Sequence, residues 1–213
     1  MSDYDSEINF YKSEVCNSEW LKSRIENDGY GDYPKWLLNH TGSRVLEIGC
    51  GPCSSLYYGM KHKYLDVTCV DACANQYKEI LNNKLYHPII NGYGEDIAEM
   101  FYLQSFDIVF MQNSLDHTVD PYKVVNGCLS VLRQGGILSI SGFTNEGLMQ
   151  KYDGLHKHNF DVVDGILYYS YKDNEEPQNF IQDLNKGLMV INWSNNEVKC
   201  GRNWFDIRYK VLQ

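Results

Sequence analysis

Three histidines stand where an imidazole could accept a proton or bind a substrate. His117 follows a predicted strand over residues 106–111, and a parallel sheet places its ligand crevice at the carboxyl ends of its strands. An ordinary imidazole pKa suits a general base that takes the proton of a reacting hydroxyl. His156 and His158 alternate along the chain, so both rings face the same side if this segment is extended. The alternative for each histidine is a structural hydrogen bond or a surface position.

The same histidines raise the question of a metal ion. His156 and His158 could join Asp116 or Asp120 in holding a divalent ion that lowers the pKa of a substrate hydroxyl. Two histidines at this spacing are not a specific metal signature, so no metal site is predicted. We instead predict His117 and His156 as catalytic residues and His158 as a substrate ligand.

A glycine turn follows the apolar run that begins at residue 45, in the stretch VLEIGCGPCSS. The run has the composition of a strand buried on both faces, and Gly49 and Gly51 break it sharply. Glycines at such a turn let a ligand approach backbone that a side chain would shield. Glu47 lies just inside the end of the strand, and we predict that it points toward that ligand. The stretch therefore predicts a nucleotide-binding turn between a strand and a helix.

Three kinds of site share parts of this pattern. A dinucleotide fingerprint needs a third glycine where the chain has Ser54, which disfavours a nicotinamide cofactor. Cys50 and Cys53 are spaced as in a thioredoxin dithiol, but Gly49 stands where thioredoxins have a tryptophan. The remaining pattern, acidic-x-Gly-x-Gly starting at Glu47, resembles the first motif of class I S-adenosylmethionine-dependent methyltransferases. That family often has another glycine where this chain has Cys53.

A carboxylate ends the second predicted strand, residues 67–70. Asp71 lies 20 positions beyond Gly51, where folds of this kind place an acid on the ribose hydroxyls of the cofactor. The alternative is a cap on the helix predicted over residues 72–85. Strand end and spacing favour the ribose role, and Ala72 is expected in the same cofactor site.

A pair of acids, Glu95 and Asp96, follows a predicted third strand around Ile89 and Ile90. The step resembles the Gly-Asp-Ala step after the third strand of these methyltransferases, where an acid reaches the adenine amine. Glu95 falls on that acid and Asp96 is its neighbour. An acidic start to a helix is the alternative, and both interpretations stay open. Asn113, just past the fourth strand, is also expected at the cofactor.

Four motifs follow one another from the fourth predicted strand onward: Phe-Asp-Ile-Val within that strand, then Leu-x-His, Asp-Pro and Val-Leu-Arg-x-Gly-Gly. This order resembles the small-molecule branch of the class I methyltransferases over residues 45–142. The resemblance implies a Rossmann-like α/β fold with a mostly parallel seven-stranded sheet, an antiparallel last strand and S-adenosylmethionine as cofactor. Residues 113–116 are Asn-Ser-Leu-Asp instead of Asn-Pro-Pro-aromatic, which disfavours nucleobase or glutamine nitrogen as the acceptor.

Further elements are predicted before and after residues 45–142. Residues 7–26 carry a loose helical period, and the predicted helices cover a sheet edge or, alternatively, form a lid with Tyr11, Tyr30 or Tyr33 facing the ligand. Of these tyrosines, Tyr11 is predicted to contact substrate. Residues 160–169 predict an inserted β-hairpin with an Asp-Gly turn. Two closing strands are predicted, with a turn at residues 195–196.

The length and the net charge of the chain limit its number of domains and its kinds of partner. A chain of 213 residues is predicted to form a single domain, with N-terminal helices in 1–43, a cofactor-binding core in 44–142 and a substrate-side hairpin with C-terminal strands in 143–213. A net charge of −9 disfavours nucleic acid as the partner. Seven cysteines without regular spacing, a polar N-terminus and no long apolar run predict a cytoplasmic protein away from the membrane.

These observations together predict an S-adenosylmethionine-dependent O-methyltransferase. The expected acceptor is a hydroxyl on a small polar molecule, such as a sugar or a sugar nucleotide, by analogy with the family. A nicotinamide-dependent oxidoreductase and a non-catalytic cofactor-binding partner subunit are the alternatives. The oligomeric state is left open.

Overall fold

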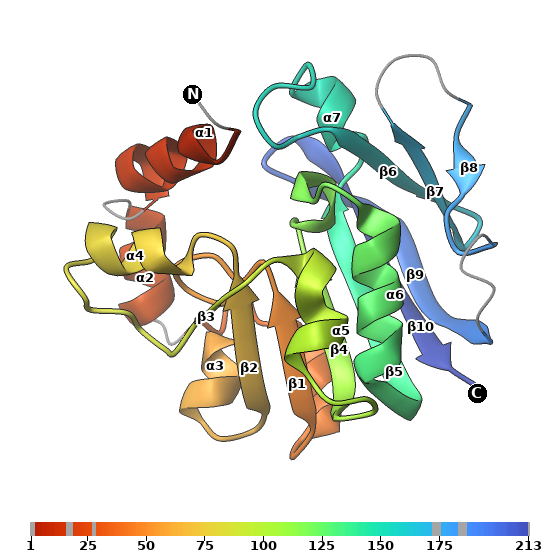
Figure 1. Ribbon diagram of the computed structural model, residues 1–213, viewed down its shortest axis with the longest axis horizontal. Coiled ribbons are helices and arrows are strands. Elements are labelled where there is room, and N and C mark those ends of the chain that lie inside the picture. The colour runs from red at the N-terminus through yellow and green to blue at the C-terminus, as the bar shows by residue number, and fades with distance from the viewer. Residues whose placement is uncertain (1–2, 16–18, 27–28, 172–175, 183–186, 213) are drawn as a thin grey trace.

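A seven-stranded sheet forms the centre of the computed structural model, which describes residues 3–15, 19–26, 29–171, 176–182 and 187–212 (Figure 1). The strand order is β3-β2-β1-β4-β5-β10-β9. The first five strands run parallel, and β10 is antiparallel to both of its neighbours, β5 and β9. The strands are β1 (Arg44–Ile48), β2 (Asp66–Asp71), β3 (Ile90–Asn91), β4 (Phe106–Gln112), β5 (Leu132–Phe143), β9 (Leu188–Lys199) and β10 (Arg202–Val211). The predicted sheet is confirmed.

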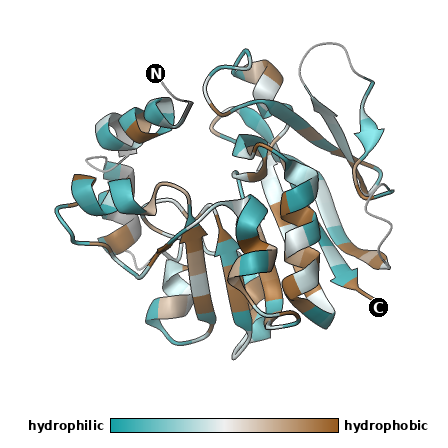
Figure 2. Ribbon diagram, viewed as in Figure 1, coloured by the Kyte–Doolittle hydropathy of each residue, from teal (hydrophilic) through white to brown (hydrophobic). Residues whose placement is uncertain are grey.

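The central strands β1 and β4 are buried on both faces of the sheet, where their successive side chains point in opposite directions. Leu46 and Val109 pack with the helix α6 (Pro121–Val131) in one apolar cluster. Val45 and Ile108, one position earlier on the same strands, belong to a second cluster. Figure 2 shows the apolar residues along the central strands. This double burial explains why the strands read as continuous apolar runs.

Some helices cover the faces of the sheet, and others lie beyond the carboxyl ends of its parallel strands. Figure 1 shows α5 and α6 side by side on one face of the sheet and α1 near α4 beyond the ends of the strands. Within the described residues, no helix is long and apolar enough to cross a membrane. Besides α6, the helical elements are α1 (Asp3–Phe10), η1 (Tyr11–Val15), α2 (Glu19–Glu26), η2 (Lys35–His40), α3 (Tyr57–Lys61), α4 (Ala74–Ile80), η3 (Gly94–Asp96), α5 (Ile97–Met100), η4 (Leu115–His117) and α7 (Glu146–Met149).

The predicted hairpin is present and belongs to a separate small sheet. Strands β6 (His158–Val163) and β7 (Ile166–Tyr171) pair antiparallel, and β8 (Gln178–Asn179) adds a third strand that the sequence did not indicate. Asp164 and Gly165 both have positive φ, 50° and 76°, as a two-residue type I′ turn requires. Phe160 and Leu167 lie in the same apolar cluster as α6, so the hairpin extends the main core.

Two local predictions are wrong. The helix predicted over residues 72–85 spans only Ala74–Ile80, because residues 82 and 83 both have positive φ, which ends a right-handed helix. The turn predicted at residues 195–196 lies inside β9, and the chain reverses instead at Cys200 and Gly201, where φ is 51° and 75°. Asparagine pairs favour turns, but the pairing of β9 with β10 continues past this pair.

Candidate active site

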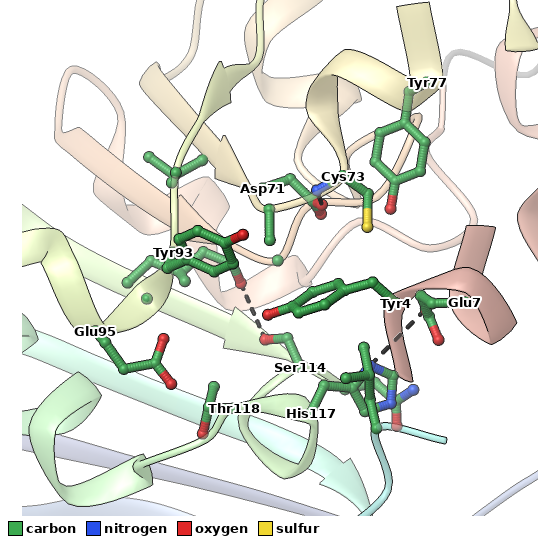
Figure 3. A pocket seen from close by; sticks show the side chains of 18 of the residues that line it. Tyr4, Glu7, Asp71, Cys73, Tyr77, Tyr93, Glu95, Ser114, His117 and Thr118 are labelled. Carbon is green, nitrogen blue, oxygen red and sulfur yellow. Dashed lines mark hydrogen bonds and ion pairs between the residues drawn. The ribbon is translucent and has the colours of Figure 1, made fainter. Parts of the chain in front are cut away.

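A cleft opens at the carboxyl ends of β1, β2 and β4 (Figure 3). In the strand order, β1 lies between β2 and β4, and this reversal is where open α/β sheets bind their ligands. The N-terminal helices close the cleft from the side opposite the sheet, through Tyr4, Glu7 and Tyr11. Lining residues from the sheet side are Gly49, Asp71, Ala72, Glu95, Asn113, Ser114, His117 and Thr118.

The first glycine of the turn is held by contacts that leave no room for a side chain. Gly49 has φ +72°, and a Cβ placed on it would lie 2.3 Å from Cβ of Ser114. The amide of Gly49 donates to the carbonyl of Val70 at 2.8 Å, and Ser114 Oγ donates to the carbonyl of Ile48 at 3.0 Å. The turn therefore joins β1 to the ends of both neighbouring strands.

Asp71 fixes the second glycine of the turn. Its Oδ2 accepts from the amide of Gly51 at 2.9 Å, and its Oδ1 accepts from the amide of Cys73 at 2.8 Å. Burial raises the pKa of Asp71, and the two backbone hydrogen bonds oppose that rise. The side chain of Tyr77 forms a third hydrogen bond with this carboxylate. Because a carboxylate has about four acceptor positions, about one remains. Asp71 and its neighbour Ala72 both line the cleft.

Glu47 lies behind the turn. Its carboxylate is 2% exposed and accepts hydrogen bonds from the hydroxyls of Ser54 and Ser55. It lines the space on the side of Cys50 and Gln112 and not the cleft that Asp71 lines. The sequence placed an acid here but gave no sign that the two serines after the turn would bind it.

The two neighbouring acids after β3 separate in the structure. Glu95 lines the cleft, and its Oε1 accepts from the amides of Val119 and Asp120 at 2.7 and 3.2 Å. Asp96 does not line the cleft and pairs with Lys123 at 3.7 Å on the surface. Of the two, only Glu95 is placed to meet a ligand in this cleft.

His117 and His156 meet beside the cleft and share one carboxylate. His117 Nε2 lies 3.0 Å from His156 Nδ1 and 3.3 Å from Asp116 Oδ2. His156 Nδ1 lies 2.9 Å from the same Asp116 oxygen. Across the cleft, Glu7 Oε1 lies 3.8 Å from His117 Nδ1 (Figure 3). The structure therefore brings together the two histidines that the sequence named as catalytic.

Charge within this cluster changes the titration of its members. Burial by itself lowers the pKa of His117, but the adjacent charge and hydrogen bond of Asp116 raise it to about 9. Burial would raise the pKa of Asp116, but His117 and His156 hold it well below its usual range. The ordinary imidazole pKa that the sequence analysis assumed for His117 is therefore wrong.

His158 does not join the cluster of Asp116, His117 and His156 but links two neighbouring segments. Its Nε2 lies 2.7 Å from the carbonyl of Thr118, and its Nδ1 lies 3.1 Å from the hydroxyl of Tyr169. Burial lowers its pKa, which favours the neutral ring. These contacts join β6 to the segment after η4. His158 does not line the cleft, so the predicted substrate contact would need a ligand that reaches past the cleft.

The N-terminal segment contributes more than the sequence indicated. Tyr11 lines the cleft, whereas Tyr33 is buried in the core and Tyr30 lies on the surface. Tyr4 and Glu7 also line the cleft, and sequence reasoning missed both. A loose helical period gives no direction for a helix face, so no signal in the sequence could have identified them.

The cysteine pair of the turn carries no redox site. Cys50 and Cys53 are both free and buried. Burial raises the pKa of the Cys50 thiol well above its usual range, which keeps it protonated. A reactive dithiol needs a lowered pKa and exposure.

Comparison with known proteins identifies the core. Residues 46–140 match the family model described as methyltransferase domain. A ubiquinone biosynthesis O-methyltransferase of Caulobacter sp. (strain K31) is 29% identical over 126 residues, which cover 58% of this chain and 48% of that protein. A protein of the same name from Paraburkholderia phymatum is 34% identical over 112 residues, covering 48% of this chain and 46% of the relative. The chain thus spans about half the length of the curated relatives it matches.

A solved structure shares the fold along the whole chain. The N-methyltransferase NodS of Bradyrhizobium japonicum WM9, in complex with S-adenosyl-L-homocysteine, superposes with a TM-score of 0.59 at 12% identity. The superposition covers 100% of both chains. At this identity the likeness concerns the fold.

Gly49→Ala is expected to destabilise the fold by roughly 2–4 kcal/mol, because a left-handed φ and a clash with Ser114 add together. Gly42→Ala is the matched control, since Gly42 has φ +84° but a Cβ there would meet no atom within 4 Å. It should cost only about 1–2 kcal/mol. Chemical denaturation measures both. Equal losses in the two variants would contradict the close approach at Gly49.

His87 makes the turn sensitive to acid. Its Nε2 accepts from the amide of Ser54 at 2.9 Å, and its Nδ1 lies 3.1 Å from the carbonyl of Pro88, so the neutral ring fits both contacts. Burial lowers its pKa. Its stabilisation is therefore complete above the unfolded pKa of about 6.5 and is lost as the pH falls below it. The melting temperature should drop between pH 7 and pH 5, and less so in His87→Gln, whose amide oxygen can accept from Ser54. An unchanged pH slope in that variant would contradict this role.

Proposed function

We propose that this chain, a class I S-adenosylmethionine-dependent methyltransferase by its matched domain and its fold, methylates a hydroxyl of a small polar acceptor such as a sugar or a sugar nucleotide. The predicted family is confirmed for residues 46–140. The names of the curated relatives, which are O-methyltransferases, support oxygen as the acceptor atom. The single observation that carries the proposal is that His117, which belongs to the histidine cluster, lines the same cleft as Gly49 and Asp71.

The residues of the cleft fit an adenosyl cofactor. Gly49 lines the cleft, and Gly51 lines the adjoining space beside Cys50, so a ligand at the turn would contact their backbone. We assign Asp71 to the ribose hydroxyls, because its carboxylate is fixed by two amides and by Tyr77, lines the cleft and still has about one acceptor position. Glu95 is assigned to the adenine amine, since two amides hold its carboxylate at the cleft wall. Ala72 and Asn113 also line the cleft and are the other proposed cofactor contacts.

For methyl transfer, the main task of the protein is to position the acceptor oxygen against the methyl group of the cofactor. The acceptor oxygen forms a bond to the methyl carbon while the bond between that carbon and sulfur breaks. The electron pair of the broken bond stays on sulfur, which gives S-adenosylhomocysteine. The hydroxyl proton must leave the oxygen in the same process. Holding the oxygen in line with the methyl group supplies most of the rate.

The cluster of Asp116, His117 and His156 is the proposed place for the acceptor hydroxyl. His117 lines the cofactor cleft, so an oxygen bound beside it lies next to the cofactor. His156 reaches the cluster from the segment before β6 and is the second proposed catalytic residue. Tyr11 is the proposed substrate contact from the N-terminal side.

Calorimetric titration with S-adenosylhomocysteine, with NADH in parallel, tests the cofactor assignment. Transfer of a labelled methyl group to sugars, sugar nucleotides and matched amino sugars then tests the acceptor. His156→Gln is expected to lower kcat by about 10²–10⁴-fold while S-adenosylhomocysteine affinity stays unchanged. Binding of NADH alone, or transfer to the amines only, would overturn the proposal.

Asp71→Ala should weaken S-adenosylhomocysteine binding by about 1–3 kcal/mol, the scale for losing a hydrogen bond to a charged group. Asp66→Ala is the matched control, because Asp66 is an exposed acid at the opposite end of the same strand. Thermal unfolding of both variants checks that the loss concerns binding and not the fold. Unchanged affinity in folded Asp71→Ala would contradict the ribose assignment.

A further inference from the structure

Three potential ligand atoms converge beside the cofactor cleft: Asp116 Oδ2, His117 Nε2 and His156 Nδ1. Their separations are 2.9, 3.0 and 3.3 Å, which is close to an equilateral triangle. Ligand atoms about 2.1 Å from one metal ion lie about 3.0 Å apart at right angles and about 3.4 Å apart in a tetrahedron. Two of the observed separations fall within this range and the third, 2.9 Å, is just below it, so an ion fits with little movement of the side chains.

No arrangement of protons on the two histidines gives favourable contacts between all three atoms of the triangle. An imidazole nitrogen carries at most one proton, and each of the two nitrogens here faces both other corners. If only His156 Nδ1 carries a proton directed at Asp116, the lone pair of His117 Nε2 faces the carboxylate at 3.3 Å. If only His117 Nε2 carries a proton, the lone pair of His156 Nδ1 faces the carboxylate at 2.9 Å. If both nitrogens carry protons, two N–H groups crowd together at 3.0 Å. A cation bound just outside the plane of the triangle interacts favourably with all three atoms.

A carboxylate outside the triangle lies within ion-pair distance of one of the rings. Glu7 Oε1, from α1, lies 3.8 Å from His117 Nδ1 (Figure 3). A proton on Nδ1 facing Glu7 leaves the lone pair of Nε2 directed into the triangle. Metal-binding histidines commonly have a carboxylate at their second nitrogen, which fixes the tautomer and raises the basicity of the ligand. This contact comes from a different part of the chain than the triangle itself.

We infer that Asp116, His117 and His156 form a site for a divalent transition-metal ion that opens onto the cofactor cleft. Two imidazoles and one carboxylate on one side of the ion suit Fe²⁺, Co²⁺ or Zn²⁺ and leave coordination positions for other ligands. The sequence alone predicts no metal site and offers His156 with His158 as the alternative ligand pair. The structure instead pairs His156 with His117, while His158 binds Thr118 and Tyr169.

The open positions suggest what the ion would do, and this role rests on the proposed function. An acceptor hydroxyl bound to the ion loses its proton more readily, because the cation stabilises the alkoxide. The proton passes to solvent, and the oxygen then forms its bond to the methyl carbon. Ion binding itself needs neither cofactor nor acceptor, so it can be tested alone.

The test is titration of the chelator-treated full-length protein with Co²⁺, followed by visible absorption and by calorimetry. We expect one ion per chain. Asp116→Asn and His156→Gln should weaken binding by about 100-fold or more, and Glu7→Gln by about 10–100-fold, the range for an outer carboxylate. His62→Gln is the control, because this exposed histidine lies on α3's C-terminal side, outside the triangle. Circular dichroism confirms that each variant is folded, and Glu7→Gln carries the test if a ligand variant does not fold.

Several results would overturn the inference. These are no binding of Co²⁺ or Zn²⁺ at millimolar concentration, a sulfur-to-cobalt charge-transfer band that assigns the ion to cysteines, or equal affinity in the wild type and the triangle variants. Methyl transfer that survives complete chelation would refute the role of the ion and leave the proposed function intact. A bound ion without transfer to any acceptor would refute the proposed function and leave the metal site intact.

Discussion

The cleft depends on how closely the turn after β1 packs against the segment after β4. Gly49 and Ser114 approach so closely that no Cβ fits between them. This contact holds the start of η4 over the ends of the strands and so sets where His117 lies relative to the turn. On the other side, Asp71 ties Gly51 to the end of β2. One short turn therefore contacts both the carboxylate of Asp71 and the segment that carries Asp116 and His117.

Three segments that are distant in the sequence complete the site around this turn. The segment after β4 supplies Asp116 and His117, the segment before β6 supplies His156, and α1 supplies Glu7. His158 and Thr118 join the small sheet to the same region. The hairpin and the N-terminal helix thus act together on one cluster, although neither belongs to the matched domain at residues 46–140.

Local patterns made much of the core predictable. The strand before Gly49 and the acid at Asp71 follow from burial and from spacing along a strand–turn–helix unit, which short-range sequence encodes. The partners of Glu47 were not predictable, because a buried carboxylate can be satisfied by any nearby hydroxyl. The contact of His117 with His156 joins residues 39 positions apart and depends on how the hairpin docks. Turn propensity also failed at residues 195–196, where strand pairing continues through the asparagines.

The most direct test of this account is a crystal structure of the protein with S-adenosylhomocysteine bound. The account predicts the ribose hydroxyls on Asp71, the adenine amine near Glu95 and the sulfur directed toward the cluster of Asp116, His117 and His156. In that arrangement a methyl group on the sulfur would face an acceptor oxygen held by the cluster. A cofactor product bound elsewhere, or bound with its sulfur directed away from the histidines, would contradict the central claim that this cleft carries out methyl transfer.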